Sequence, residues 1–243
     1  MNLLIDLGNT RLKWAMCDTE TWRTGALEHG PDLIRELERA VGSAMPARAL
    51  MSSVAKDPVT RAVTDWIAQH WSLETERVVP VKESLGVRNL YENPAQLGSD
   101  RWAALVAARV LFQGRLCVID CGTAITIDAL SEDGAFLGGA ILPGVSAIRQ
   151  SLALSTPLIL TPGRDGDCLA RSTADGIAVG TRFGLAGGID RLLEEYERVL
   201  GVPMPVIVTG GDADRLCPDL HHETRVVPDL VLRGIALIAT VLT

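Results

Sequence analysis

One short pattern occurs twice in this chain, at residues 3–10 (LLIDLGNT) and at residues 117–124 (CVIDCGTA). In each copy an apolar run ends in an aspartate, Asp6 or Asp120, and a glycine follows two positions later. A second apolar run comes next, so each copy predicts a strand, a tight turn and a returning strand. The aspartate then lies at a strand end, and the glycine lets backbone N–H groups approach a ligand closely. Two copies predict two similar domains that face each other across a nucleotide.

Length and composition agree with two domains. The chain has 243 residues, enough for two domains of roughly 100–130 residues each. Its 47% hydrophobic content is typical of a packed core. The net charge of −7 and the pI of about 5.1 argue against a general nucleic-acid binder, which needs a basic surface. A small anion is still possible, because a turn of N–H groups and one lysine can hold a phosphate.

The sequence also predicts a cytoplasmic protein without a membrane segment. Asp6 and Lys13 interrupt the first apolar stretch, which therefore does not resemble a secretory signal. Residues 230–242 are apolar but shorter than the roughly 20 residues that cross a bilayer, so they predict a buried terminal helix. The five cysteines form no Cys-x-x-Cys pair. We expect unpaired thiols in a reducing compartment.

Apolar periodicity predicts α/β structure in both halves. Beyond the two hairpins and the terminal helix, the expected helices are 31–41, 57–70, 100–112 and 173–200, and the expected strands are 49–54, 77–81, 136–144 and 206–208. Residues 82–98 are expected to form a long loop, and residues 156–167, rich in Pro, Gly and Asp, a mobile stretch. Gly114 marks a boundary, which predicts domains at residues 1–113 and 114–243.

Two glycine turns are candidates for nucleotide contacts. Residues 6–10 (DLGNT), with Lys13, have the composition of a phosphate turn, in which backbone, hydroxyl and ammonium groups surround phosphate oxygens. An ordinary Gly-Asn hairpin with a solvent-facing lysine is the alternative, and the second copy favours function. Residues 209–211 (TGG) follow an apolar strand and would let a nucleoside lie against the backbone. Glycines also end strands without any function.

Residues 98–101 (GSDR) are the candidate reactive site. Asp100 is expected near a helix N-terminus, which stabilises a carboxylate but is also the place of an ordinary N-cap. Arg101 beside it could clamp an anion. Tyr91 lies in the preceding loop as a ligand contact or as a loop anchor. His221 and His222 suggest a metal, but no third ligand has suitable spacing, so a solvated pair is expected.

Five motifs in this order resemble those of type III pantothenate kinases, in the acetate and sugar kinase, heat-shock protein and actin superfamily. They are residues 6–13 (DLGNTRLK), 98–102 (GSDRW), 120–128 (DCGTAITID), 138–144 (GGAILPG) and 209–211 (TGG). The resemblance covers essentially the whole chain. Ser99 stands where the family often has alanine. The fold implied is α/β, with two similar ribonuclease H-like or actin-like domains, mixed sheets flanked by helices, and a ligand cleft between the domains.

The resemblance implies ATP-dependent phosphorylation of pantothenate to 4′-phosphopantothenate, the first step of coenzyme A biosynthesis. It implies ATP, Mg²⁺ and a monovalent cation, K⁺ or NH₄⁺, as cofactors. Asp100 would be the general base, and Asp120 would bind the monovalent cation. The residues implied for pantothenate are Tyr91, Gly98, Ser99, Asp100, Arg101 and Thr173. Those implied for ATP are Asp6, Leu7, Gly8, Asn9, Thr10, Arg11, Leu12, Lys13 and Thr123, with Asp6 also near the metal.

Family members are homodimers with pantothenate close to the subunit interface, so a homodimer is expected, with no nucleic-acid or membrane partner. Two alternatives stay open. A non-catalytic regulator related to the Bvg accessory factor of the same family would be expected to lose the base or the lysine. A superfamily kinase for another small alcohol would keep both hairpins without needing Tyr91 or the Asp100–Arg101 pair.

Overall fold

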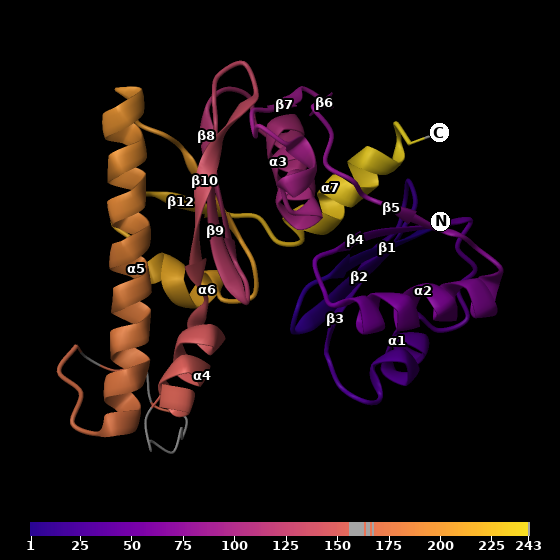
Figure 1. Ribbon diagram of the computed structural model, residues 1–243, viewed down its shortest axis with the longest axis horizontal. Coiled ribbons are helices and arrows are strands. Elements are labelled where there is room, and N and C mark those ends of the chain that lie inside the picture. The colour runs from indigo at the N-terminus through magenta and orange to yellow at the C-terminus, as the bar shows by residue number, and fades with distance from the viewer. Residues whose placement is uncertain (156–162, 164–165, 167, 243) are drawn as a thin grey trace. The chain divides into compact units, whose positions relative to one another are not determined.

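The computed structural model describes the chain except for residues 156–162, 164–165, 167 and 243. The chain divides into two compact units (Figure 1): unit 1 is Met1–Gln113 with Asp229–Thr243, and unit 2 is Gly114–Pro228. The expected domain boundary at Gly114 coincides with the start of unit 2. The expected second domain, residues 114–243, differs from unit 2 at its end, because Asp229–Thr243 packs with unit 1.

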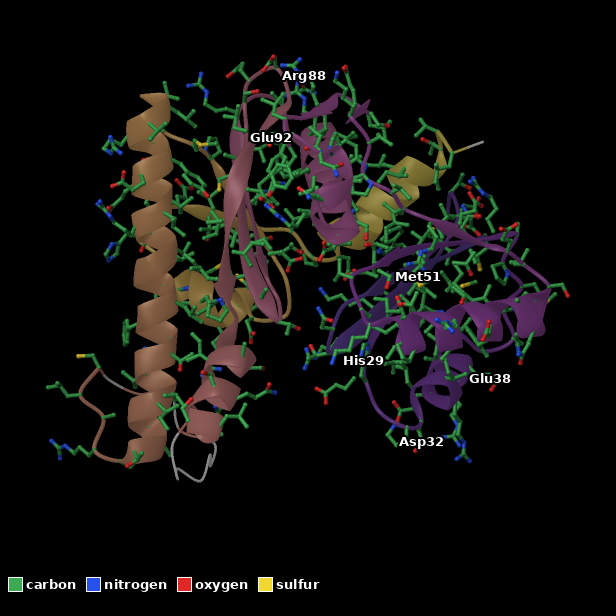
Figure 2. All side chains as sticks on the ribbon, in the orientation of Figure 1. His29, Asp32, Glu38, Met51, Arg88 and Glu92 are labelled. Carbon is green, nitrogen blue, oxygen red and sulfur yellow. The ribbon has the colours of Figure 1, made fainter. Side chains whose placement is uncertain are left out.

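Unit 1 is built on a five-stranded mixed sheet with the order β3-β2-β1-β4-β5. Its strands are β1 (Asn2–Leu7), β2 (Arg11–Cys17), β3 (Trp22–Glu28), β4 (Arg48–Ser53) and β5 (Thr75–Arg77). β1, β2 and β3 pair antiparallel, whereas β1, β4 and β5 pair parallel. Side chains alternate between the two faces of a strand. One face carries Ile5, Leu7 and Met51 and packs against α1 (Leu33–Val41) and α2 (Asp57–Trp71). Met51, which is fully buried, is labelled in Figure 2.

The other face of this sheet contacts α3 (Ser99–Leu111) and α7 (Leu230–Ala239). These two helices pack closely, because Gly234 lies against the backbone of Ala103 and a Cβ at Gly234 would overlap that backbone. Arg48 of β4 donates to the carbonyl of Ala239 at 2.8 Å. These contacts explain why the terminal helix, expected as buried, belongs to unit 1.

Two sequence expectations within unit 1 are wrong. The strand expected at 77–81 is β5 and ends at Arg77. The long loop expected at 82–98 contains a hairpin of β6 (Glu83–Ser84) and β7 (Val87–Asn89), and a 3-10 helix, η1 (Pro94–Gln96). These elements are two or three residues long, too short for an apolar period to be recognised.

Unit 2 repeats the strand order of unit 1. Its strands are β8 (Leu116–Cys121), β9 (Ala124–Leu130), β10 (Ala135–Pro143), β11 (Val206–Thr209) and β12 (Thr224–Val226). They follow the order β10-β9-β8-β11-β12. β10, β9 and β8 pair antiparallel, whereas β8, β11 and β12 pair parallel. The long helix α5 (Thr173–Leu200) and the short α6 (Ala213–Leu216) pack on this sheet (Figure 1). The expected α/β fold with two similar halves is therefore confirmed.

The remaining elements of unit 2 are α4 (Val145–Ser155) and the 3-10 helix η2 (Cys217–Asp219). The stretch expected to be mobile, residues 156–167, lies mostly outside the described residues. All five cysteines are free, as expected. Within the described part of the chain, no helix has the length and apolarity needed to span a bilayer.

His222 is not the solvated residue that the sequence suggests. Its side chain is 18% exposed, and its Nδ1 lies 2.7 Å from Oδ1 of Asp190, a buried aspartate of α5. Its Nε2 lies 3.8 Å from Oε2 of Glu197. His221, by contrast, has an 89% exposed side chain, and its backbone N–H donates to Asp190 at 3.0 Å. His222 therefore joins α5 to the segment that precedes β12.

These contacts determine the charge state of Asp190. Burial raises the pKa of its carboxyl, but the hydrogen bonds from His222 and His221 outweigh burial, so the net pKa lies below its ordinary value. A depressed carboxyl pKa stabilises the fold at pH values above the ordinary aspartate pKa of about 3.9. That contribution is lost as the pH falls through the lowered pKa.

We expect His222→Gln to lower the free energy of unfolding by about 1.5–3 kcal/mol at pH 7, because it removes a hydrogen bond to a buried carboxylate. Urea unfolding measures the change. His221→Gln is the matched control and should change little, since it keeps the backbone hydrogen bond. The deficit of the His222 variant should shrink below about pH 4 as Asp190 is protonated. Equal stability of the two variants at pH 7 would contradict a stabilising role for the His222–Asp190 contact.

Candidate functional site

The first strand turn of unit 1 brings three polar side chains together. Asp6 lies at the end of β1, with Lys13 of β2 opposite it on one side and Ser52 of β4 on the other. Residues that pair across a sheet point to the same face, so all three lie on the face that α3 and α7 contact. Asp6 and Ser52 are buried and Lys13 is half-buried. The expected association of Asp6 with Lys13 is therefore present.

The turn between β1 and β2 is held from its backbone. The Gly8 N–H donates to the Arg11 carbonyl at 3.0 Å, and the His29 N–H donates to the Thr10 carbonyl at 2.9 Å. Asn9 and Thr10 are exposed. Burial lowers the pKa of His29 (labelled in Figure 2), opposed by a hydrogen bond with the backbone of Asn9. The turn thus has a hydrogen-bonded backbone and exposed side chains at Asn9 and Thr10.

The side chains of three residues in the expected ATP-binding segment make other contacts. Leu7 and Leu12 are completely buried in the core, so only their backbones could contact a ligand. Arg11 is exposed, and its Nη2 lies 3.0 Å from Oε1 of Glu28 on the neighbouring strand. Lys13 is therefore the better placed cation of this turn, because it shares the face of Asp6.

The second group of unit 1 lies at the start of α3. Gly98 is the N-cap residue and Asp100 is in the first turn of the helix, so Asp100 is not the N-cap that the sequence allowed. Its Oδ1 accepts the N–H of Arg101 at 2.8 Å. A Cβ at Gly98 would overlap this same Oδ1, so a side chain there would displace the carboxylate.

Burial and two neighbouring cations act on the Asp100 carboxyl in opposite directions. Burial raises its pKa above the ordinary value, while the N–H and charge of Arg101 and the charge of Lys13 act in the opposite direction. Lys13 is therefore within electrostatic reach of Asp100, which links the two groups of unit 1. A raised carboxyl pKa brings an acid or base closer to the working pH.

The side chains of Arg101 and Tyr91 contact each other. The Arg101 Nη1 donates to the Tyr91 hydroxyl at 3.1 Å, and the guanidinium carbon lies 5.9 Å from the tyrosine ring centroid. The Tyr91 N–H donates to Asn89 Oδ1 at 3.0 Å, and Asn89 is buried. Tyr91 is thus fixed at the end of the β6–β7 hairpin. Two residues that the resemblance implies for pantothenate, Tyr91 and Arg101, therefore lie together.

In unit 2, Asp120 occupies the place that Asp6 has in unit 1. It pairs with Thr126 on β9 and with the buried Thr209 on β11. Gly210 follows with φ of +100°, and a Cβ there would contact Asp120 Oδ1 at 2.5 Å and the Cys121 backbone. This glycine turn therefore packs closely against the Asp120 carboxylate and the Cys121 backbone, and a side chain at Gly210 would displace them.

Two further residues of unit 2, Thr123 and Thr173, were predicted to contact a ligand. Thr123 is exposed in the turn after Asp120, and its carbonyl accepts the Gly144 N–H at 3.0 Å. Thr173 is the first residue of α5 and lines a groove of about 710 Å³. The groove is otherwise mainly apolar or glycine-lined: Leu142, Pro143, Ile148, Leu152, Gly176, Ile177, Gly180, Thr181, Gly184, Leu185 and Gly188.

Sequence reasoning missed two polar residues of these groups. Ser52 and Asn89 are both buried, and each contacts or pairs with a predicted residue. Ser52 is the next-to-last residue of β4 and Asn89 ends β7, and a polar residue near the end of a strand was the only signal available. No group of three or more His, Cys, Asp or Glu that could hold a metal occurs among the residues described.

Solved structures similar to this one share its fold. A Baf family transcriptional activator from Campylobacter jejuni has a TM-score of 0.57 at 21% identity, covering 98% of this chain and 97% of its own. A ROK family glucokinase from Streptomyces griseus, in complex with glucose and AMPPNP, has a TM-score of 0.53 at 14% identity, covering 98% of both chains. The duplicated fold is thus that of the actin-like ATPases and sugar kinases.

Comparison of sequences is more specific. The family model described as type III pantothenate kinase matches residues 2–195. A type III pantothenate kinase from Nitrosospira multiformis is 39% identical over 238 residues, which cover 98% of this chain and 90% of the relative. One from Chromobacterium violaceum is 41% identical over 244 residues, covering 98% and 99%. The chain belongs to the type III pantothenate kinase family.

The Gly210 turn gives a testable expectation. Gly210→Ala should destabilise the protein by about 1–3 kcal/mol, because alanine is strained at φ +100° and its Cβ meets Asp120 and the Cys121 backbone. Gly187→Ala is the control, since Gly187 lies in α5 with open space around it and alanine favours a helix. Thermal unfolding of both variants measures the difference. A Gly210 variant as stable as wild type would show that the turn tolerates a side chain.

Proposed function

We propose that this chain transfers the γ-phosphoryl group of ATP to the primary hydroxyl of pantothenate, giving 4′-phosphopantothenate, the first step of coenzyme A biosynthesis. Membership of the family supports the reaction. The observation that carries the mechanism is the Asp100 carboxyl, whose pKa is raised by burial at the start of α3, with Arg101 beside it and the charge of Lys13 within reach.

The turn of residues 8–10 binds the ATP phosphates in this proposal. The Gly8 N–H donates to the Arg11 carbonyl, so the N–H groups of Asn9 and Thr10 and the Thr10 hydroxyl are the donors suited to phosphate oxygens, and Lys13 adds a positive charge. Asp6 fits a magnesium ion, because its carboxylate oxygens at a strand end are ligands that Mg²⁺ prefers. When bound, Mg²⁺ neutralises phosphate charge. Arg11 contributes less, since it is exposed and paired with Glu28.

Asp100 accepts the proton of the pantothenate hydroxyl as that oxygen attacks the γ-phosphorus. Phosphoryl transfer depends mainly on positioning and charge neutralisation, so the base also orients the nucleophile. Arg101, fixed by Tyr91, offers a guanidinium that suits the carboxylate of pantothenate. Gly98 leaves room for the Asp100 carboxylate. Thr173 contributes a hydroxyl from the groove in unit 2.

Asp120 holds a monovalent cation, K⁺ or NH₄⁺, in this proposal. The carboxylate at the end of β8, with the hydroxyl residues Thr126 and Thr209 as its register partners, supports such a site. A single carboxylate suits a large, weakly hydrated ion better than Mg²⁺, which demands a near-ideal octahedral shell. When bound, the cation supplies positive charge near Asp120. Thr123, in the same turn, contacts ATP.

A homodimer and a cytoplasmic location complete the proposal. The mainly apolar groove that includes Thr173 supports contact with a second copy near the pantothenate site. Five free thiols, three of them buried, suit a reducing compartment.

The alternatives are less well supported. A non-catalytic regulator has no need of a half-buried carboxyl beside an arginine, yet Asp100, Arg101 and Lys13 are all present. Likeness to the Baf family transcriptional activator shows the fold alone. A kinase for another alcohol does not account for the Tyr91–Arg101 contact, which suits an anionic substrate.

Asp100→Asn should abolish phosphorylation while ATP binding is largely kept. The amide has the same shape but cannot accept the proton, and a general base contributes about 10²–10⁴-fold. A coupled assay of ADP release with pantothenate gives turnover, and calorimetry gives nucleotide affinity. Turnover within a few-fold of wild type would rule out Asp100 as the base.

Replacing K⁺ by Na⁺ at matched ionic strength should depress the rate strongly in wild type. Sodium is smaller and more strongly hydrated, so a site with one carboxylate compensates less well for the loss of its water. Asp120→Ala should be poorly active in either salt, because it removes the charged ligand. The measurement is the initial rate in each chloride salt. Equal wild-type rates in both salts would refute the cation site.

A further inference from the structure

The start of α3 is attached to β4 by a buried pair of hydroxyl groups. Ser52 is 0% exposed and Ser99 is 8% exposed, and their Oγ atoms lie 2.9 Å apart. The Ser53 N–H donates to Ser99 Oγ at 3.1 Å, and the Ser53 carbonyl lies 3.4 Å from the same Oγ. A serine hydroxyl has one proton and two lone pairs. The hydroxyl of Ser99 is therefore engaged inside unit 1.

The position of this pair connects the two groups of the candidate site. Ser52 is the register partner of Asp6 across the parallel β1–β4 pairing. Ser99 directly precedes Asp100 in the first turn of α3. The N-cap residue is Gly98, which has no side chain to fasten the helix start. The hydroxyl pair provides this attachment instead.

We propose that in this chain, where Ser99 replaces the alanine that is frequent in the family, Ser52 and Ser99 are positioning residues that hold the Asp100 carboxylate in place relative to the Asp6 turn, and that Ser99 does not bind substrate through its hydroxyl. The inference rests on the proposed role of Asp100 as the base. Ser52 has no other assigned role in this site. Catalysis by a base is sensitive to placement, since a misplacement of 1 Å can cost about 100-fold in rate.

An adjacent hydroxyl pair supplies a matched control. Ser53 Oγ lies 2.8 Å from Thr60 Oγ1, so this second contact joins the same end of β4 to α2. It has the same chemistry and similar length but does not reach the helix that carries Asp100. Thr60→Ala therefore removes a comparable hydrogen bond without releasing the start of α3.

The test compares Ser52→Ala, Ser99→Ala, the double variant, Thr60→Ala and Asp100→Asn in the full chain. Thermal unfolding first confirms that each is folded. Each single serine variant should lower kcat about tenfold, with the KM for ATP within about twofold of wild type. The double variant should be no slower than the slower single variant, because both changes break one contact. Thr60→Ala should keep wild-type kcat.

The pH dependence of kcat/KM distinguishes release of the start of α3 from a general loss of stability. Burial raises the pKa of Asp100, so a released helix start exposes the carboxyl and lowers that pKa. The acid limb of kcat/KM should move to lower pH in Ser99→Ala and stay in place in Thr60→Ala. Substrate binding through the Ser99 hydroxyl predicts instead a raised KM for pantothenate with unchanged kcat and an unmoved acid limb.

Each outcome bears on one claim. A folded Ser99→Ala variant with kcat within twofold of wild type overturns the positioning pair, as does an equal loss in Thr60→Ala or strictly multiplicative losses in the double variant. Asp100→Asn separates the two proposals. If it keeps wild-type turnover, the role of Asp100 as base fails. If it is inactive while Ser99→Ala is fully active, only the positioning pair fails.

Discussion

The parallel pairing of β1 with β4 is the constraint on which the polar site of unit 1 depends. Its register sets Asp6 beside Ser52, and Ser52 in turn contacts the serine that begins α3. A shift of one residue in this pairing would turn Ser52 to the opposite face of the sheet. The apolar residues of β4 resist such a shift, because Met51 would then leave the core formed with α1 and α2. Core packing thereby fixes the polar geometry.

The two halves of the chain share one topology, but the corresponding aspartates, Asp6 and Asp120, have different electrostatic surroundings. The five strands β1–β5 of unit 1 and the five strands β8–β12 of unit 2 have the same order and the same sense of pairing. The turns differ: Leu7 pairs with Leu12 in the first hairpin and Cys121 with Ile125 in the second, so the second turn is one residue shorter. Asp6 faces Lys13, whereas Asp120 faces Thr126. The first aspartate thus has a cationic neighbour across the strand, and the second has a hydroxyl.

The sequence predicted the features that depend on local pattern. The repeated motif gave both hairpins, and apolar spacing gave the long helix α5 within its observed bounds. The motif at residues 98–101 placed Asp100 at a helix start. The resemblance to a family gave the reaction and most of the candidate residues, which periodicity alone could not have supplied.

Features that depend on contacts between distant residues were not predictable. The partner of His222 is 32 positions away on α5, and nothing near His222 indicates a buried acid. The partner of Ser99 is 47 positions away, and a serine that ends a strand is common. The edge strand β5 (TER) is polar, so the strand was expected at the apolar residues that follow it, 77–81.

The return of α7 to unit 1 has a consequence for how the protein is made. Domains generally fold as units during synthesis, from the N-terminus onward. Unit 2 is continuous in sequence and can form as soon as it leaves the ribosome. Unit 1 cannot, because Gly234 and its helix are translated after all of unit 2, and until then one face of α3 lacks its packing partner. The half of the chain that is translated first is thus the half whose folding finishes last.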